Sequence, residues 1–201
     1  ASETPLEGFN VKVMDQDGSN LIEKGSDITD ANGYFECTVS NEPDENGLDL
    51  FICLELNDSI VRIQPHGLFA SPYKWYSTGY GDIHTREFDF ETLKPSDTNT
   101  EIEGAFSIWH WITNRYYLLN SDAGNSLPKV TVKWEKGVAV GSSQSGSTIV
   151  IAGINDPDHY DPDIILHEYG HFVMHSTAGS PPGSGGEHTY TAPSSLATAY
   201  S

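Results

Sequence analysis

Two histidines and a glutamate late in the sequence have the types and the spacing needed to activate a water molecule. His167 and His171 are four residues apart, and Glu168 directly follows the first histidine. Residues four apart on a helix lie on one face, so both imidazoles can reach one metal ion while the neighbouring carboxylate reaches the water that the ion activates. The spacing therefore predicts a divalent metal ion held by His167 and His171, with Glu168 as the general base.

The residues around this motif predict a helix with a marked start. Asp161 can act as the N-cap, Pro162 suits the first helical position, and Asp163 suits the positive end of the helix dipole. Apolar side chains then occur nearly all the way round the expected helix, at Ile164, Ile165, Leu166, Phe172, Val173 and Met174. This distribution is typical of a helix buried in a domain. The alternative to a metal site is a pair of histidines that are merely hydrogen-bonded in the core.

The order His-Glu-x-x-His resembles the active-site motif of the zinc peptidases called zincins. The resemblance implies Zn²⁺ as the cofactor and a protein or peptide as the substrate. A catalytic zinc ion has three protein ligands and one open position, so a third ligand is needed. His175 continues the four-residue spacing, but it lies about 12 Å along the helix axis from His167, which is too far to share the ion.

The third ligand distinguishes the subfamilies of zincins. Metzincins have a glycine and a histidine three and six residues after the second motif histidine, where this sequence has Met174 and Thr177. Gluzincins take a glutamate from a later helix, and Glu187 is the one acidic residue after the motif in this sequence. The resemblance makes Glu187 a candidate ligand, although it follows a Gly/Pro/Ser-rich stretch. His188 and Tyr190 could bind substrate or stabilise an oxyanion.

The end of the sequence begins a further helix that has no stop signal. Pro193 falls near its first turn, and good helix formers follow up to Ser201. We therefore expect the front part of a longer gluzincin-like protein, whose third zinc ligand could lie beyond Ser201. On that expectation this chain alone would bind zinc weakly and have little or no activity.

The elements ahead of the metal helix predict a mixed subdomain. Apolar residues at spacings of three and four predict an amphipathic helix over residues 101–119. Residues 130–134 and 148–152 read as strands, separated by a Gly/Ser-rich loop at 141–147. This order resembles the upper subdomain of zincins, and the resemblance makes 148–152 the edge strand that pairs with an extended substrate.

The first half of the sequence predicts a small antiparallel β-sandwich, because short strands recur without a helical period. The expected strands are residues 9–14, 34–39, 48–56, 60–63 and 86–90. Residues 11–13 and 29–35 resemble the transthyretin-like, carboxypeptidase-regulatory-like modules attached to many secreted or surface proteins. Asn32 and Gly33 suit the tight turn of that motif. An alternative role for the turns is a calcium site formed by Asp15, Asp17 and Asp30.

The predicted fold class is therefore α+β and multidomain. A transthyretin-like β-sandwich would occupy residues 1–94, and a partial zincin-like catalytic subdomain with a buried active-site helix would occupy residues 95–201. Pro95 marks the boundary, because it disfavours helix before it while Ser96 or Asp97 can cap the helix that follows.

The composition limits the classes of partner. The 201 residues include 29 acidic and 10 basic ones, for a net charge of −19. Such a charge argues against nucleic acid or an anionic membrane surface as the partner. No stretch reaches the roughly 18 apolar residues of a membrane span, and the first residues form no signal peptide. The resemblances imply an extracellular or cell-surface protein.

The two cysteines leave a disulfide open. Cys37 and Cys53 fall in neighbouring expected strands, so they could pair if those strands do. Side-chain alternation, however, places them in different layers of the sandwich.

The leading hypothesis is a zinc metallopeptidase, or a fragment of one, with an N-terminal β-module. A rival is a non-catalytic surface binding or adhesion protein whose zincin-like half has lost catalysis. A third hypothesis is a zinc hydrolase acting on something other than peptides, because the motif specifies activated water more firmly than it specifies the substrate.

Overall fold

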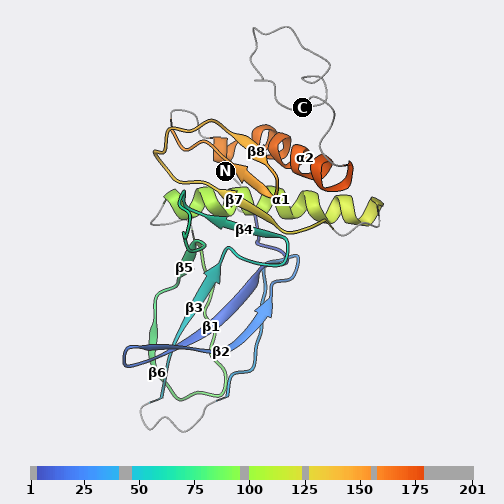
Figure 1. The fold of residues 1–201 in the computed structure, drawn as a ribbon. Helices are drawn as coiled ribbons and strands as arrows, with labels where there is room; N and C mark the ends of the chain where they lie inside the picture. The colour runs from blue at the N-terminus through green and yellow to red at the C-terminus, as the bar shows by residue number, and fades with distance from the viewer. Residues whose placement is uncertain (1–3, 41–46, 96–99, 124–126, 155–157, 179–201) are drawn as a thin grey trace, which may run out of the picture. The chain divides into compact units, whose positions relative to one another are not determined.

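The computed structural model describes residues 4–40, 47–95, 100–123, 127–154 and 158–178. These residues form a mixed α+β fold, which confirms that part of the predicted class. The chain divides into two compact units (Figure 1). One comprises Ala1–Asp58 and Pro72–Glu103, and the other comprises Ser59–Ser71 and Gly104–Ser201. The predicted boundary between residues 94 and 95 stays a prediction.

The first unit is built on an antiparallel sheet with the strand order β2-β1-β3-β5, in which β6 also pairs with β3. Its strands are β1 (Asn10–Asp17), β2 (Asn20–Ile28), β3 (Leu48–Glu55), β5 (Lys74–Tyr76) and β6 (Tyr80–Ile83). Gly18 has a φ of 59° in the turn between β1 and β2, a conformation that glycine adopts at little cost. The turn signal at residues 15–18 therefore marks a hairpin, although β1 continues to Asp17.

Alternating side chains of β1 and β3 build the core of this unit. Val11 lies opposite Leu54 and Val13 lies opposite Ile52, and all four side chains are buried. Strands expose and bury successive residues in turn, so the alternation in the sequence marks this face of the sheet. The strands expected at residues 9–14 and 48–56 are thus confirmed.

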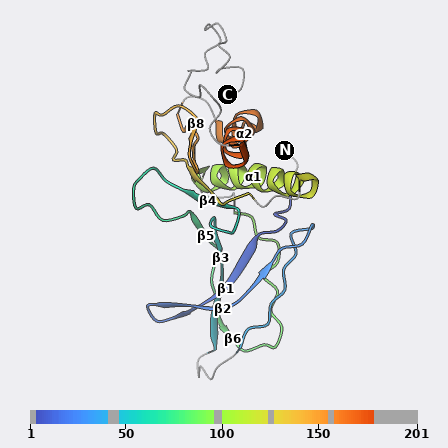
Figure 2. The ribbon, with the colours of Figure 1, turned by 45° about the vertical axis from the view of Figure 1, so that its right-hand side comes forward.

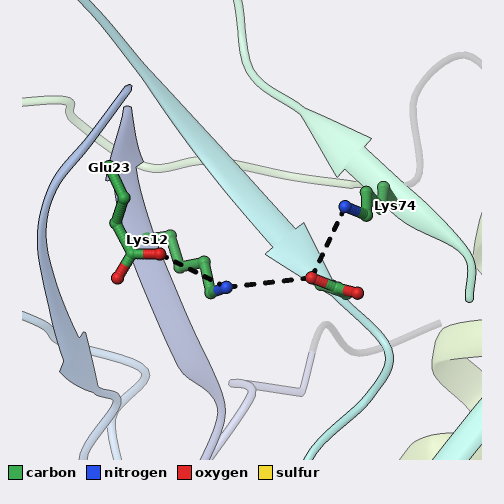
Figure 3. Close-up of polar contacts among 4 residues, drawn as sticks. Lys12, Glu23 and Lys74 are labelled. Atoms are coloured by element: carbon green, nitrogen blue, oxygen red, sulfur yellow. Dashed lines mark ion pairs between the residues drawn. The ribbon is translucent and has the colours of Figure 1, made fainter. Parts of the chain in front are cut away.

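The other face of the same sheet carries a chain of ion pairs across four strands (Figure 3). Lys12 Nζ lies 3.3 Å from Glu23 Oε2 and 3.8 Å from Glu55 Oε2. Lys74 Nζ lies 3.5 Å from the same oxygen of Glu55. These side chains are partly exposed, so each pair contributes about 0.2–1 kcal/mol.

The strands expected at residues 34–39 and 86–90 are wrong, because both segments lack regular strand pairing. Their alternation reflects aromatic packing instead: the Phe88 and Phe90 ring centroids lie 5.0 Å apart, and those of Phe35 and Phe90 lie 6.4 Å apart. Tyr80 of β6 joins this cluster, 4.9 Å from Phe88. Alternating aromatics indicate a buried side, but they do not require ladder hydrogen bonds. The complete β-sandwich stays a prediction.

The second unit contains a mixed sheet with the strand order β4-β7-β9-β8. Its strands are β4 (Val61–Gln64), β7 (Val130–Lys133), β8 (Ser143–Ser145) and β9 (Thr148–Val150). Strands β4, β7 and β9 run parallel, and β8 pairs with β9 in the antiparallel sense. The segment at residues 60–63 was expected in the N-terminal sandwich, but β4 pairs with β7. Placing it there is wrong, since a short alternating run specifies a strand and not its partner.

The expected edge strand is also in a different place. Residues 148–152 were predicted to be the edge, but β9 pairs with β7 on one side and with β8 on the other. The edge is β8, which lies within the expected loop at residues 141–147. Its sequence, Ser-Gln-Ser, has no apolar residue, so backbone pairing forms a strand there that side-chain patterning cannot reveal.

Two helices accompany this sheet. They are α1 (Thr100–Ala123) and α2 (Pro162–Ala178), and Figure 2 shows both on the same side of β4 and β8. The amphipathic helix expected at 101–119 is confirmed, with Ala105, Trp109 and Ile112 buried. Within the described residues, neither helix is long and apolar enough to cross a membrane.

Gly104 allows a close approach between α1 and two aromatic rings of the second unit. A Cβ placed on Gly104 would lie 2.5 Å from the Trp134 ring and 2.6 Å from the His159 ring. The Trp134 and His159 ring centroids are themselves 4.7 Å apart. A larger residue than glycine on α1 would therefore force these rings to move.

Candidate metal centre

Helix α2 carries the His-Glu-x-x-His motif, and its first turn is capped by a side chain. A single turn of 3-10 helix, η1 (Asp158–Tyr160), precedes it. The backbone N–H of Asp163 donates to Asp161 Oδ1 at 2.9 Å, and the N–H of Ile165 donates to the Asp161 carbonyl at 3.1 Å. Asp161 is thus the N-cap and Pro162 the first helical residue, as the sequence predicts.

The two motif histidines bring their side-chain nitrogens close together. Their Nε2 atoms lie 2.9 Å apart, and their ring planes are nearly perpendicular. Two nitrogen ligands of a tetrahedral zinc ion, each about 2.05 Å from it, are separated by about 3.3 Å. The observed separation is close to that value, and the same separation also suits a hydrogen bond from one imidazole to the other. His167 and His171 therefore fit a shared metal ion without rearrangement of the helix.

Glu168 lies beside this pair in a different environment. His167 is exposed, whereas Glu168 is only 8% exposed. Burial, together with a smaller contribution from the nearby charge of Asp158, raises the pKa of the Glu168 carboxyl to about 7. Loss of hydration disfavours the carboxylate form, and a second carboxylate adds repulsion. A carboxyl with this pKa can exchange protons near neutral pH.

Helix α2 was predicted to be buried on nearly all sides, but its faces differ in exposure. Ile165, Tyr169 and Phe172 are buried, and burial raises the pKa of the Tyr169 hydroxyl. His167 and His175 are exposed. The prediction of a helix buried all round is therefore wrong for one face, because the metal motif itself lies toward solvent.

Sequence reasoning missed a polar contact next to Glu168. Asp158 is 7% exposed, and its Oδ2 accepts a 2.6 Å hydrogen bond from Ser142 Oγ. Ser142 Oγ in turn accepts a hydrogen bond from the Ala152 N–H at 2.9 Å. The sequence indicated a Gly/Ser-rich loop at residues 141–147 and an N-cap at Asp161. It contained no signal that pairs a serine with an aspartate 16 residues later.

The remaining predicted site residues lie elsewhere. Glu187, His188 and Tyr190 fall outside the described residues. His175 lies in the last turn of α2 and is exposed. In the part of the chain that the structure describes, no group of three or more His, Cys, Asp or Glu side chains could hold a metal ion. The described centre therefore consists of two imidazoles and one carboxyl.

The alternative calcium site is not assembled. Asp15 and Asp17 lie at the turn end of the β1–β2 hairpin, whereas Asp30 follows the opposite end, where Asn10 pairs with Ile28. Asp30 Oδ1 instead accepts hydrogen bonds from the backbone N–H groups of Asn32 and Tyr34, at 2.8 and 2.9 Å. Asp30 thus closes a local turn, which is the usual role of aspartate at such positions.

The two cysteines are free thiols in the structure. Cys53 lies on β3, while Cys37 lies beside Gly25 of β2, and β1 separates those two strands. The disulfide between Cys37 and Cys53, which the sequence left undecided, is therefore not formed in the structure. Burial raises the pKa of both thiols, which lowers the fraction present as reactive thiolate.

Comparison with protein-family models, curated proteins and solved structures gives no match for this chain. The resemblances to zincins and to transthyretin-like modules therefore stay predictions. What the geometry supplies by itself is a pair of imidazole nitrogens 2.9 Å apart, on the helix that also carries a buried carboxyl with a raised pKa. This combination suits activation of water at a metal ion.

Proposed function

We propose that this chain carries the metal-binding helix and the general base of a zinc-dependent peptide hydrolase. The observation that supports this most is the 2.9 Å separation of the His167 and His171 Nε2 atoms, on the helix that also carries the buried Glu168. The third ligand would come from outside the described residues, either from Glu187 or from a residue beyond Ser201. The two histidines alone predict weak zinc binding and little turnover by these 201 residues.

Each residue of the centre has a definite role in this proposal. His167 and His171 would hold the zinc ion through Nε2. A bound zinc ion would polarise the scissile carbonyl and acidify water. Glu168 would accept the proton of the attacking water and pass it to the leaving amine. Its pKa of about 7 supports this role, because a base works best when its pKa is near the working pH.

The sheet next to α2 supports a peptide as the substrate. Strand β8 is the edge of that sheet and contacts α2. In the described residues β8 pairs only with β9, so its other side could add an extended peptide by main-chain hydrogen bonds. A peptide bound there would run beside the helix that carries Glu168. The zincin resemblance gives the same role to an edge strand.

The proposal extends to the remaining parts of the chain. The second unit, Ser59–Ser71 with Gly104–Ser201, would be the upper subdomain of a zincin, and the first unit, Ala1–Asp58 with Pro72–Glu103, a transthyretin-like β-sandwich module. The antiparallel sheet β2-β1-β3-β5 supports the assignment of the first unit as the β-module. The mixed sheet with two helices supports the assignment of the second unit as the zincin-like subdomain. On the resemblance of the first half to modules of secreted or surface proteins, the proposal includes a location at the cell surface or outside the cell.

Peptide hydrolysis in the presence of zinc tests the proposal. The assay would compare this chain with a longer chain extended beyond Ser201, using a mixture of fluorescent peptides. We expect zinc-dependent cleavage by the longer chain, loss of cleavage on chelation, and recovery on addition of zinc. His171→Ala should remove the activity, while the matched variant His175→Ala, on the same helix, should retain it. A longer chain with neither zinc nor cleavage would contradict the proposal and favour the surface-binding hypothesis.

A further inference from the structure

Ser142 connects three segments of the second unit through one hydroxyl group. It stands directly before the edge strand β8. Its Oγ accepts the N–H of Ala152, which follows β9, and donates to Oδ2 of Asp158, the first residue of η1. The two hydrogen bonds use both the acceptor and the donor capacity of the hydroxyl. The edge strand, the end of its neighbour and the approach to α2 are thus joined at one atom.

Asp158 continues this connection into α2. Its carbonyl accepts the N–H of Asp161 at 3.0 Å, and Asp161 is the N-cap of the helix. Its side chain is buried, and its charge is near enough to Glu168 to affect the ionisation of that carboxyl. A buried carboxylate is costly unless it is hydrogen-bonded, so the bond from Ser142 stabilises the position of Asp158.

Beyond its pairing with β9 and its contact with α2, β8 has little side-chain burial. The strand has three residues, of which Ser143 and Ser145 are exposed, and it contributes no large apolar side chain to the core. Its backbone bonds to β9 fix its register along that strand. The hydroxyl of Ser142 is therefore a side-chain contact that links the start of β8 to the segment entering α2.

We propose that Ser142 and Asp158 are positioning residues that hold the edge strand β8 in a fixed relation to Glu168 on α2. The catalytic meaning of this inference rests on the proposed function, because it concerns alignment of a peptide on β8 with the general base. The structural part does not depend on zinc, so it can be tested separately.

Hydrogen exchange of backbone amides tests the structural part. Ser142→Ala leaves the Ala152 N–H and the Asp158 carboxylate without the hydroxyl, so we expect exchange at Ala152 and in β8 to be about tenfold faster. Ser142→Thr retains a hydroxyl and should restore slow exchange. Ser143→Ala, which removes a neighbouring exposed hydroxyl, is the matched control and should change little. Unchanged exchange in Ser142→Ala, or equal acceleration in β8 and in the distant strands β1 and β3, would overturn the inference.

Steady-state kinetics test the catalytic part, using the zinc-loaded protein and one peptide substrate. Ser142→Ala should raise KM about tenfold with kcat changed less than about threefold, because a loosened β8 binds the peptide less well. Ser142→Thr should return KM to the original value. A fall in kcat with no change in KM would contradict the positioning of β8. Absence of zinc binding and cleavage in the unaltered protein, with the exchange pattern as expected, would contradict the proposed function while leaving the link between β8 and α2 in place.

Discussion

Both units of the molecule bury carboxyl groups, and Asp15 in the first has neighbours of opposite charge to those of Glu168 in the second. Asp15 in the first unit is 3% exposed, and Glu168 in the second is 8% exposed. Asp15 has a compensating cation, Lys24 Nζ at 3.8 Å, and accepts the Asp49 N–H at 2.9 Å. Glu168 instead lies near the carboxylate of Asp158, and its pKa is raised to about 7.

The difference separates a structural carboxylate from a reactive one. A buried charge with a cation and an amide donor stabilises one conformation. A buried carboxyl next to another acid is held close to its titration point. Burial is the larger cause of the raised pKa of Glu168 and the charge of Asp158 is the smaller one, whereas the buried Asp15 lies beside a cation.

The largest effect should appear in catalysis. Glu168→Gln in a zinc-loaded, active form of the protein should retain the metal and lower kcat by about 10²–10⁴-fold, because the base is removed while the histidines remain. Asp15→Asn is the matched change in the other unit and should leave kcat within about threefold. Peptide hydrolysis and zinc content of both variants check this. Normal turnover by Glu168→Gln would end the assignment of Glu168 as the base.

The next effect concerns stability of the first unit. Asp15→Ala leaves the largely buried Lys24 side chain without this partner and removes the acceptor for the Asp49 N–H, so we expect a loss of about 3 kcal/mol in the free energy of unfolding. Denaturant unfolding followed by hydrogen exchange in β1 and β3 measures it. Changing Asp15 to alanine and Lys24 to methionine together should recover part of the loss. An Asp15→Ala loss below about 1 kcal/mol would show that Asp15 is not held as described.

A smaller effect should appear in the pH dependence of stability without metal. Between the ordinary carboxyl value of 4.5 and about 7, the folded state keeps the Glu168 proton that the unfolded state has released. The free energy of unfolding should therefore fall as pH rises through this window, by about 3 kcal/mol, and then level off above it. Glu168→Gln should lack this component. Chemical unfolding in the presence of a chelator, at pH 4.5 to 8, measures the difference between the two proteins. The same pH dependence of the free energy of unfolding in both proteins would contradict the raised pKa of Glu168.

The smallest effect belongs to the exposed charges of the first sheet. Glu55→Gln removes the carboxylate shared by Lys12 and Lys74, yet these side chains are solvated, so the loss should be below about 1 kcal/mol and should shrink in high salt. Denaturant unfolding at low and high salt measures it. A loss similar to that of Asp15→Ala would remove the distinction between buried and exposed carboxylates drawn here.

Local signals in the sequence predicted the elements that depend on local physics. The N-cap at Asp161 and the alternation of Val11 and Val13 each depend on neighbouring residues, and both are confirmed. The pairing of β4 with β7 and the edge position of β8 depend on residues far away in the chain. Hydrophobic patterning does not specify such partners, so both assignments were wrong.

The same distinction applies to the candidate site. The helix period brings His167 and His171 together, which the spacing alone indicates. The role of Asp158 arises from burial and from the Ser142 hydroxyl, and neither follows from residue type. Glu187, His188 and Tyr190 stay predictions, because they lie outside the described residues.

Metal titration tests the central claim most directly. Cobalt and zinc would be added to the metal-free chain, following the visible absorption of cobalt and its displacement by zinc. The account predicts one ion per chain, with affinity reduced at least about tenfold in His167→Ala and His171→Ala and within about threefold in His175→Ala. Equal affinity in all four proteins, or no binding by a chain extended beyond Ser201, would contradict it.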